Sequence, residues 1–416
     1  MGPGTRPIEW YAHRGVSDSH TRRIPTTEEL FELPIDTLPE RIVEIAERVT
    51  GSAVGLYVID LEGVALLQLV GDVSLPEEVP IPQMPGPEIP TGHLAALERS
   101  MAARGIGQIV PLWLRHRAIA VFLVDGSGGA ELETFAGQAA GALELSLRYS
   151  DRVNGARHRQ RATAGAELQQ QLLPPRMAGV RGAEIAGSVL PAYDVGGDWF
   201  DHAADRDGAW LAVADAAGKG GRASAVSALS LAAFRAARQA GASLTEAAIL
   251  MDQAVVGFGD SSLFVTTLLA RWDAASRTLE WLTCGHLPPC RLSRDGTVDE
   301  LEAGVFPPLG VLDGVRLATM RSLLVPGDRV VLYSDGVVER RSLTGRLGRS
   351  GFFEHIAAID QPSAASLLTH IISHVSAAHE TPLDDDATVL VLGILDDRAR
   401  EPAPHPPALE PGPEGA

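Results

Sequence analysis

The chain has 416 residues with 35 basic and 53 acidic side chains, a formal net charge of −18 and a hydrophobic fraction of 45%. These values predict two or three globular domains of about 150 residues each, and the acidic balance disfavours nucleic acid as a partner. A count of only two cysteines excludes a disulfide scaffold. No apolar run approaches the roughly 18 residues that cross a bilayer. We therefore expect a cytoplasmic protein that does not enter the membrane.

The N-terminal part of the chain is predicted to hold an arm and a first folded unit. Residues 1–35 are polar and rich in proline and glycine, and we interpret them as a loose arm. The unit covers residues 36–148. It opens with apolar residues at helical spacing over 38–51, ending at a glycine. Residues 53–70 then alternate like two strands joined by a turn.

The rest of this unit continues the same mixture of helices and strands. A Pro-rich loop is expected over 75–92, a helix over 92–105, a hairpin over 108–124 and a long helix over 131–150. The order helix, hairpin, loop, helix, hairpin, helix resembles that of a GAF sensory domain. This resemblance implies either a small ligand in the centre of the unit or a module that only holds two chains together as a homodimer.

A helical pattern leads out of the first unit. It runs through residues 143–173 and ends at Pro174-Pro175, and its apolar positions are sparse for a coiled coil. We assign residues 149–178 as a helical linker. Such a helix either transmits a shift between the units that it joins or serves as a solvated spacer.

The second unit is predicted over residues 179–395, followed by a disordered Pro-rich tail over 396–416. Strand-like runs cover 183–190, 209–215, 263–272, 278–284, 289–294, 328–335 and 387–395, and helix-like runs cover 222–239, 243–258 and 364–379. Because the strands come in clusters with helices between the clusters, the pattern favours an α+β fold with antiparallel sheets.

Acidic residues lie at strand ends and turns of this unit. They are Asp198, Asp215, Asp335 and the run Asp384-Asp385-Asp386. Residues 205–208, Asp-Arg-Asp-Gly, have the pattern of a type I turn. Asp198 and Asp215 are equally far from the centre of that turn. A hairpin there would place them face to face, with Cβ atoms roughly 4.5–5.5 Å apart.

Two facing carboxylates repel each other, so the pair needs a compensating charge. No lysine or arginine lies within two residues of either one. A shared proton or a divalent cation could compensate, and the glycines beside Asp198 and after Asp215 leave room for an ion and a phosphate. If the strand before Asp335 pairs antiparallel with the strand after Asp385, these carboxylates join the same cluster. Each position alone is more simply a turn former or a solvated residue, but their combination favours a metal site.

Ordered motifs in this part of the chain point to a known family. They are LQQQLLPPRMAG, PAYDVGGDWFD, ADAAGKGGRAS, TCGHLPPCRL, FPPLGV, PGDRVVLYSDGVVE and DDATVLVL. Over about residues 165–395 the chain resembles the bacterial sporulation-phosphatase-E-type branch of the PPM (type 2C) metal-dependent Ser/Thr protein phosphatases. The resemblance implies a β-sandwich flanked by helices, with two Mn²⁺ or Mg²⁺ ions at one end.

The resemblance also implies roles for single residues. The implied metal ligands are Asp198, Asp215, the backbone carbonyl of Ala216, Asp335 and Asp385. Asp215 would bridge the two ions, and Asp386 would lie beside the site without binding them. The implied reaction is hydrolysis of phosphoserine or phosphothreonine by a water that the metals activate, without a protein nucleophile. The implied substrate is a phosphorylated regulatory protein, an anti-sigma-factor antagonist, with regulation by the GAF-like domain.

Other interpretations of the motifs are weaker. The GKGGRAS segment is not a Walker A loop, because Gly220 follows Lys219. Cys284 and Cys290 lack a fourth zinc ligand, so we interpret them as ordinary buried thiols and His286 as a core or loop histidine. The rival function is a non-catalytic pseudophosphatase that senses a ligand and binds a partner. Retention of all the predicted metal carboxylates favours the enzyme.

Overall fold

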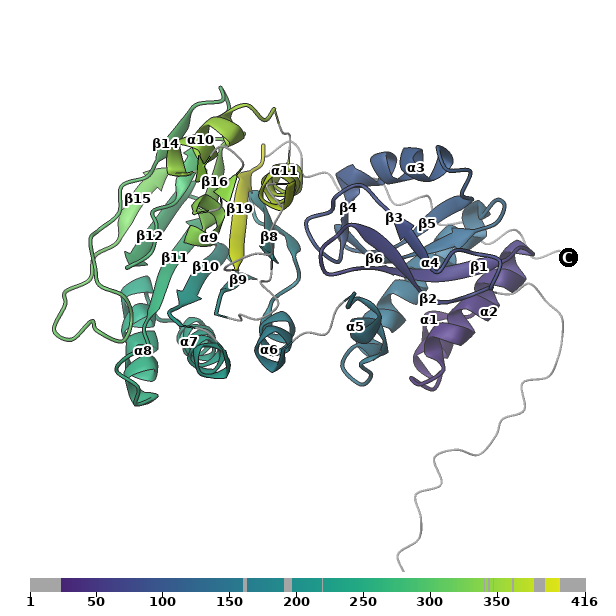
Figure 1. The fold of residues 1–416 in the computed structure, drawn as a ribbon, viewed down its shortest axis with the longest axis horizontal. Coiled ribbons are helices and arrows are strands. Elements are labelled where there is room, and N and C mark those ends of the chain that lie inside the picture. The colour runs from purple at the N-terminus through teal and green to yellow at the C-terminus, as the bar shows by residue number, and fades with distance from the viewer. Residues whose placement is uncertain are drawn as a thin grey trace, which may run out of the picture.

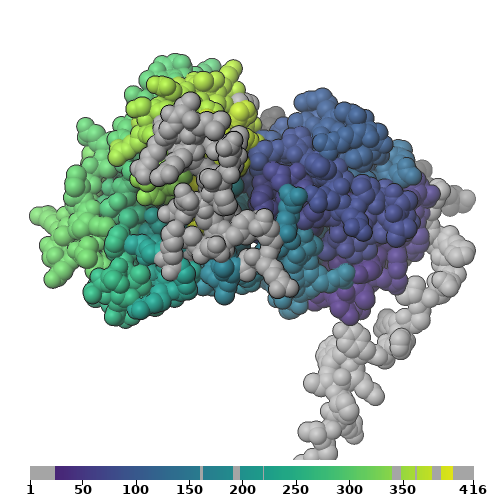
Figure 2. Space-filling model, viewed as in Figure 1, coloured from purple at the N-terminus to yellow at the C-terminus, as the bar shows by residue number. Residues whose placement is uncertain are grey.

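The computed structural model describes residues 24–159, 163–190, 197–218, 220–339, 341–342, 345–346, 348–360, 363–377 and 386–396. The elements form two lobes, coloured purple to blue and teal to yellow in Figure 1. The surfaces of the two lobes touch in the space-filling view of Figure 2. In the described part of the chain, no helix combines the length and apolar character needed to cross a membrane.

The N-terminal unit is a mixed sheet-and-helix layer structure. Its elements are α1 (Thr27–Phe31), α2 (Leu38–Thr50), β1 (Val54–Ile59), β2 (Ala65–Gly71), β3 (Glu78–Pro80), β4 (Ile89–Pro90), a 3-10 turn (Thr91–His93), α3 (Leu94–Ala102), β5 (Gln108–Leu114), β6 (Arg117–Val124) and α4 (Gly129–Ser146). The antiparallel sheet has the order β3-β2-β1-β6-β4, and β5 also pairs with β6. Strand β6 is buried along its whole length, because α2 and α4 pack on one face of the sheet and α3 on the other.

Two predictions for this unit are corrected by the structure. The arm predicted over 1–35 is not loose throughout, because α1 begins with a capping box between Thr26 and Glu29. Leu30 of this helix is only 1% exposed and packs in the core; residues 1–23 lie outside the described ranges. The loop predicted over 75–92 contains the short strands β3 and β4, which extend the sheet.

The continuous helix predicted over 143–173 is also wrong in the described residues. The chain instead forms α4, which ends at Ser146, then α5 (Arg152–Ala156) and α6 (Ala164–Leu172). A glycine inside α5 weakens it. A new helix begins after Thr163, whose side chain accepts a hydrogen bond from the N–H of Ala166 at 3.3 Å. The connection between the units is therefore a series of short helices that can pack separately.

The C-terminal unit is a sandwich of antiparallel sheets with helices outside. Its strands are β7 (Met177–Val180), β8 (Ala183–Leu190), β9 (Trp199–Ala204), β10 (Gly208–Ala216), β11 (Val265–Asp273), β12 (Thr278–Cys284), β13 (Cys290–Leu292), β14 (Val298–Glu300), β15 (Met320–Leu323), β16 (Arg329–Tyr333), β17 (Arg341–Ser342), β18 (Gly345–Arg346) and β19 (Ala387–Ile394). Its helices are α7 (Gly221–Gln239), α8 (Leu244–Gly257), α9 (Asp335–Val338), α10 (Gly348–Ala357) and α11 (Ala364–Ala377).

The core of this unit is layered. One sheet has the order β15-β12-β11-β10-β9 and the other β14-β13-β16-β19-β8-β7. Apolar side chains such as Phe200, Trp272 and Leu390 fill the space between them. Helices α7 and α8 cover the outer face of the first sheet, and α10 and α11 that of the second (Figure 1). The predicted α+β class, with a β-sandwich flanked by helices, is confirmed.

Candidate metal centre

The hairpin of β9 and β10 turns where the sequence predicts. The backbone N–H of Asp205 donates to the carbonyl of Gly208 at 3.1 Å. The Asp205 side chain in turn accepts hydrogen bonds from the N–H groups of Asp207 and Gly208, at 2.9 and 2.7 Å. An aspartate at the first position thus fixes the turn locally, and the turn fixes how the two strands are paired.

The register of this hairpin sets two acidic residues against each other. Trp199 pairs with Ala214 at the end of the ladder. The register predicted from the turn is confirmed up to this pair. Continuing it by one residue would place Asp198 opposite Asp215, and the Asp215 charge does act on the Asp198 carboxyl. Asp198 is 2% exposed, whereas Asp215 is half-buried.

Asp198 lies in a buried environment of other acidic groups. Burial raises its pKa well above the ordinary value, and the negative charges of Asp215 and Asp386 raise it further. The hydroxyls of Thr388 and Ser334 act in the opposite direction by hydrogen bonding to its carboxylate, and the Thr388 Oγ1 lies 2.6 Å from its Oδ2. The structure thus gathers three carboxylates from β10, the start of β9 and the start of β19.

In the second sheet, the end of β16 and the beginning of β19 lie beside the Asp198 carboxylate. β16 pairs antiparallel with β19, as predicted. The Ser334 N–H donates to the Thr388 carbonyl and the Thr388 N–H donates to the Ser334 hydroxyl, each at 3.0 Å. A Cβ added at Gly336 would meet the carbonyl oxygen of Asp386 at 2.0 Å, so only glycine fits there. Asp335 begins α9 beside this contact, with its side chain exposed.

The backbone carbonyl of Ala216 is also close to the cluster. A Cβ added at Gly197 would lie 2.9 Å from that oxygen, which explains a glycine directly before Asp198. The Ser227 hydroxyl of α7 donates to the Gly197 carbonyl at 2.6 Å and holds this segment. The Ala216 carbonyl therefore lies close to the backbone that directly precedes Asp198.

The described part of the predicted ligand set is incomplete. Asp384 and Asp385 lie outside the described residues, and it is Asp386, 1% exposed, that is seen beside Asp198. Within the described ranges, no group of three or more His, Cys, Asp or Glu side chains has the spacing of a metal site. The donors that are present are carboxylate and carbonyl oxygens, which are the ligands that Mg²⁺ and Mn²⁺ prefer.

Gln169 is a further site residue that the sequence does not single out. It lies on α6 and is 4% exposed. Its Nε2 donates to the backbone carbonyl of Asp198 and to the Oδ2 of Asp386, both at 2.7 Å. The LQQQLL motif contains three successive glutamines, and only the packing of α6 decides which of them faces the cluster.

Replacing Gln169 with leucine is expected to lower phosphatase activity and metal affinity about 10- to 100-fold, because Asp386 and the Asp198 backbone lose a shared donor. Phosphate release titrated with Mn²⁺ measures both quantities. Gln171→Leu on the same helix is the control, since the Gln171 side chain is exposed and its one hydrogen bond within the described ranges is to Glu167. Equal activity and equal Mn²⁺ dependence in Gln169→Leu and the wild type would contradict the role of Gln169.

The cysteines and His286 take structural positions. Both thiols are fully buried and free, as predicted, and burial raises their pKa values, that of Cys284 to about 12. His286 Nδ1 lies 2.8 Å from the Thr266 hydroxyl, and burial lowers the pKa of His286 to about 4. At neutral pH the thiols are protonated and the imidazole is neutral, so these groups are not poised as nucleophile or general acid.

A β-sandwich with carboxylates gathered where its central strands end is the architecture predicted for the PPM class of metal-dependent phosphatases. Residues 205–395 match the family model of Stage II sporulation protein E (SpoIIE). The phosphoserine phosphatase RsbU of Bacillus subtilis is 27% identical over 229 residues, which are 55% of this chain and 68% of RsbU. The C-terminal unit is therefore a SpoIIE-type PPM phosphatase domain, and the predicted family is confirmed for this unit.

Solved structures with a similar fold include two bacterial proteins. The RsbU and RsbW domains of Rv1364c from Mycobacterium tuberculosis are 28% identical, with a TM-score of 0.47, over 56% of this chain and 64% of that one. The SiaA PP2C domain of Pseudomonas aeruginosa is 22% identical, with a TM-score of 0.49, over 56% of this chain and 94% of that one. The chain thus spans about two thirds of RsbU and of the mycobacterial chain. The segment matched by the family model leaves out the N-terminal unit, whose resemblance to a GAF domain stays a prediction.

Proposed function

We propose that the protein hydrolyses phosphoserine or phosphothreonine on a regulatory protein, using two Mn²⁺ or Mg²⁺ ions. The proposed ligands are Asp198, Asp215, the Ala216 carbonyl, Asp335 and Asp385. The observation that carries the proposal is the buried Asp198, on which the charges of Asp215 and Asp386 act and whose backbone carbonyl shares the Gln169 donor with Asp386. Such a group of carboxylates is stable in its charged form only with a compensating positive charge.

The chain's own residues have distinct roles in this proposal. Thr388 and Ser334 orient the Asp198 carboxylate, and Gln169 orients Asp386. Asp215 is the more exposed of the facing pair and so lies nearer to an arriving phosphoprotein. When bound, the divalent ions would supply the positive charge that activates a water and offsets charge on the phosphoryl oxygens. With both thiols buried and protonated, the chemistry needs no covalent intermediate on cysteine.

The relatives support a proposal for the substrate class. The curated relative is described as a phosphoserine phosphatase, and one solved relative carries RsbU and RsbW domains in one chain. We therefore propose an anti-sigma-factor antagonist as the phosphoprotein. The test is phosphate release from a phosphoserine peptide and from such a protein, with and without Mn²⁺. No release from either under any metal would instead support the non-catalytic regulator.

We further propose that the N-terminal unit regulates the phosphatase and contributes a homodimer contact. The units are joined through α6, which carries Gln169 and whose Glu167 lies 3.1 Å from His158 of the preceding segment. Figure 1 places α6 between the C-terminal sandwich and α5. A shift of α6 would therefore move Gln169 relative to Asp386 and to the Asp198 backbone, to which it is hydrogen bonded.

Deleting residues 1–162, which leaves the cap of α6 in place, is expected to change basal activity about 5-fold or more or to change the oligomeric state. Phosphate release and light scattering on the full chain and on the truncated chain measure these two quantities. If the truncated chain is as active as the full chain and has the same mass in solution, the N-terminal unit does not regulate the enzyme.

A further inference from the structure

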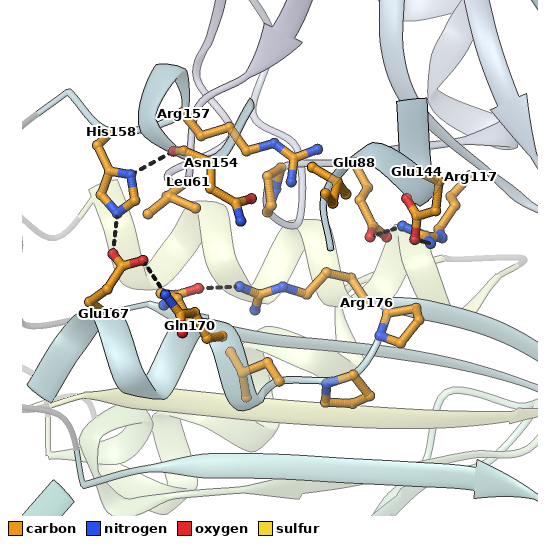
Figure 3. Close-up of a pocket in the computed structure, with 16 residues that line it drawn as sticks. Leu61, Glu88, Arg117, Glu144, Asn154, Arg157, His158, Glu167, Gln170 and Arg176 are labelled. Carbon is orange, nitrogen blue, oxygen red and sulfur yellow. Dashed lines mark hydrogen bonds and ion pairs between the residues drawn. The ribbon is translucent and has the colours of Figure 1, made fainter. Parts of the chain in front are cut away.

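A cavity of about 210 Å³ lies between the two units, away from the carboxylate cluster. Its walls come from β6 and α4 of the N-terminal unit, from α5 and from the segment that includes α6 and the start of the C-terminal sandwich. Figure 3 shows its charged side chains projecting from both units toward one space. It is large enough for a small organic anion as well as for several waters.

The acidic side chains deep in this cavity already have a basic partner. Arg117 forms ion pairs with Glu88 and with Glu144, the latter at 3.0 Å. Glu167 at the margin contacts His158 and accepts a hydrogen bond from Gln171. None of these carboxylates forms an ion pair with Arg157 or Arg176 in the described residues, although the buried Glu88 Oε2 has no hydrogen-bond partner there and the Glu88 charge acts on both arginines from a distance.

Arg157 and Arg176 have no ion pair within the described residues, and each leaves a buried donor unused. Arg176 is 5% exposed; its Nη2 donates to Gln170 at 2.8 Å, but its Nη1 has no hydrogen-bond partner in the described part of the chain. Arg157 donates from Nη2 to the Ile119 carbonyl at 3.2 Å and leaves Nε unused. The Nε2 of Gln170 is likewise a buried donor without an acceptor among the described residues.

The pKa shifts of the two arginines indicate that nearby negative charge compensates their buried positive charges only in part. Burial lowers the pKa of Arg176 to about 10 and lowers that of Arg157, and the charge of Glu88 offsets this only in part. A buried guanidinium with unused donors costs free energy, and an oxyanion can accept from several of its N–H groups at once.

We infer that this cavity binds a small oxyanion, a carboxylate or a phosphate, between the Arg157 and Arg176 guanidinium groups, with Gln170 as a further donor. The bound group would hold α5 of the linker against the first residues of the C-terminal unit. Because Gln170 is adjacent to Gln169, the anion would also fix the helix that bonds Asp386. This consequence for activity rests on the proposed function, whereas the binding itself does not.

The test is calorimetric titration of the full-length protein, freed of metal, with inorganic phosphate and separately with malonate. Without metal, an anion has no ion to bind at the catalytic cluster, so success or failure here is independent of the proposed enzyme activity. We expect one anion per chain for at least one probe. We expect binding at least about 10-fold weaker in Arg157→Gln and in Arg176→Gln, because each removes a charged donor.

Two further variants keep the result interpretable. Leu61→Trp narrows the cavity without touching a charge and is expected to weaken binding in a chain whose arginines are intact. Arg321→Gln removes an exposed arginine that pairs with Glu280 elsewhere, and binding should be unchanged. The inference is overturned if neither probe binds the wild type, or if both arginine variants, folded by circular dichroism, bind as tightly as the wild type.

Discussion

The Asp215→Asn protein is expected to hydrolyse a phosphoserine peptide about 100- to 1,000-fold more slowly than the wild type while keeping its fold. The charge of Asp215 acts on the buried Asp198, and we propose Asp215 as the ligand shared by both ions. Asparagine keeps the size and the strand pairing but removes the negative charge that holds the metals. Electrostatic groups that act directly on the reacting centre typically have effects of this size.

The stability of the same variant gives an independent signal. In the metal-free protein, replacing Asp215 should relieve repulsion with Asp198 and Asp386, so the unfolding temperature should stay equal or rise. Added Mn²⁺ should stabilise the wild type and have less effect on the variant. Thermal unfolding followed by circular dichroism, with and without Mn²⁺, measures this difference.

Asp207→Asn is the matched control for this experiment. Asp207 is an exposed aspartate at the turn of the same hairpin, remote from the carboxylate cluster. It should keep wild-type activity and the wild-type response to Mn²⁺. An Asp215→Asn protein with full activity would remove Asp215 from the metal site and end the proposed mechanism.

Removing divalent metal is expected to reduce phosphatase activity to background. The described site offers only oxygen donors and hydroxyls around the buried Asp198, and both thiols are buried with raised pKa values. With no activated protein nucleophile among these groups, a water must be activated by bound metal. Activity measured after exhaustive chelation, and again after adding back single metals, tests this directly.

The identity of the restoring metal is part of that result. Mn²⁺ and Mg²⁺ should restore turnover, because the donors are hard oxygens and both ions accept compact six-coordinate sites. Ca²⁺, which prefers longer bonds and more ligands, should restore less. Full activity in the presence of excess chelator would show that the carboxylate cluster serves another purpose.

Local sequence patterns correctly predicted much of the fold. The strands expected over 183–190 and 278–284 are observed with those bounds, because an apolar run bounded by turn residues has few other ways to bury itself. The turn at 205–208 also fixed the β9–β10 register. Strand pairing across a short hairpin is set by the turn, so Asp198 and Asp215 could be placed opposite each other before any tertiary contact was known.

Local patterns failed where packing or capping decided the outcome. A weak helical periodicity over 143–173 was extended through a stretch that contains a glycine in α5 and a new cap at Thr163. The first helix, with the buried Leu30, lies in a segment whose composition looked unstructured. In each case a few specific hydrogen bonds or one apolar contact outweighed the average character of the segment.

The sequence by itself determined which acidic residues are available, the β9–β10 hairpin and its register, and the α+β class with antiparallel sheets. Those features follow from turn chemistry and strand alternation, which act over short stretches of chain. Only the tertiary structure decided that Gln169 faces Asp198 and Asp386 and that Arg157 and Arg176 meet in one cavity. These contacts join segments that are distant along the chain or lie on different units, and no local periodicity specifies which of several similar side chains will be turned inward when those segments pack.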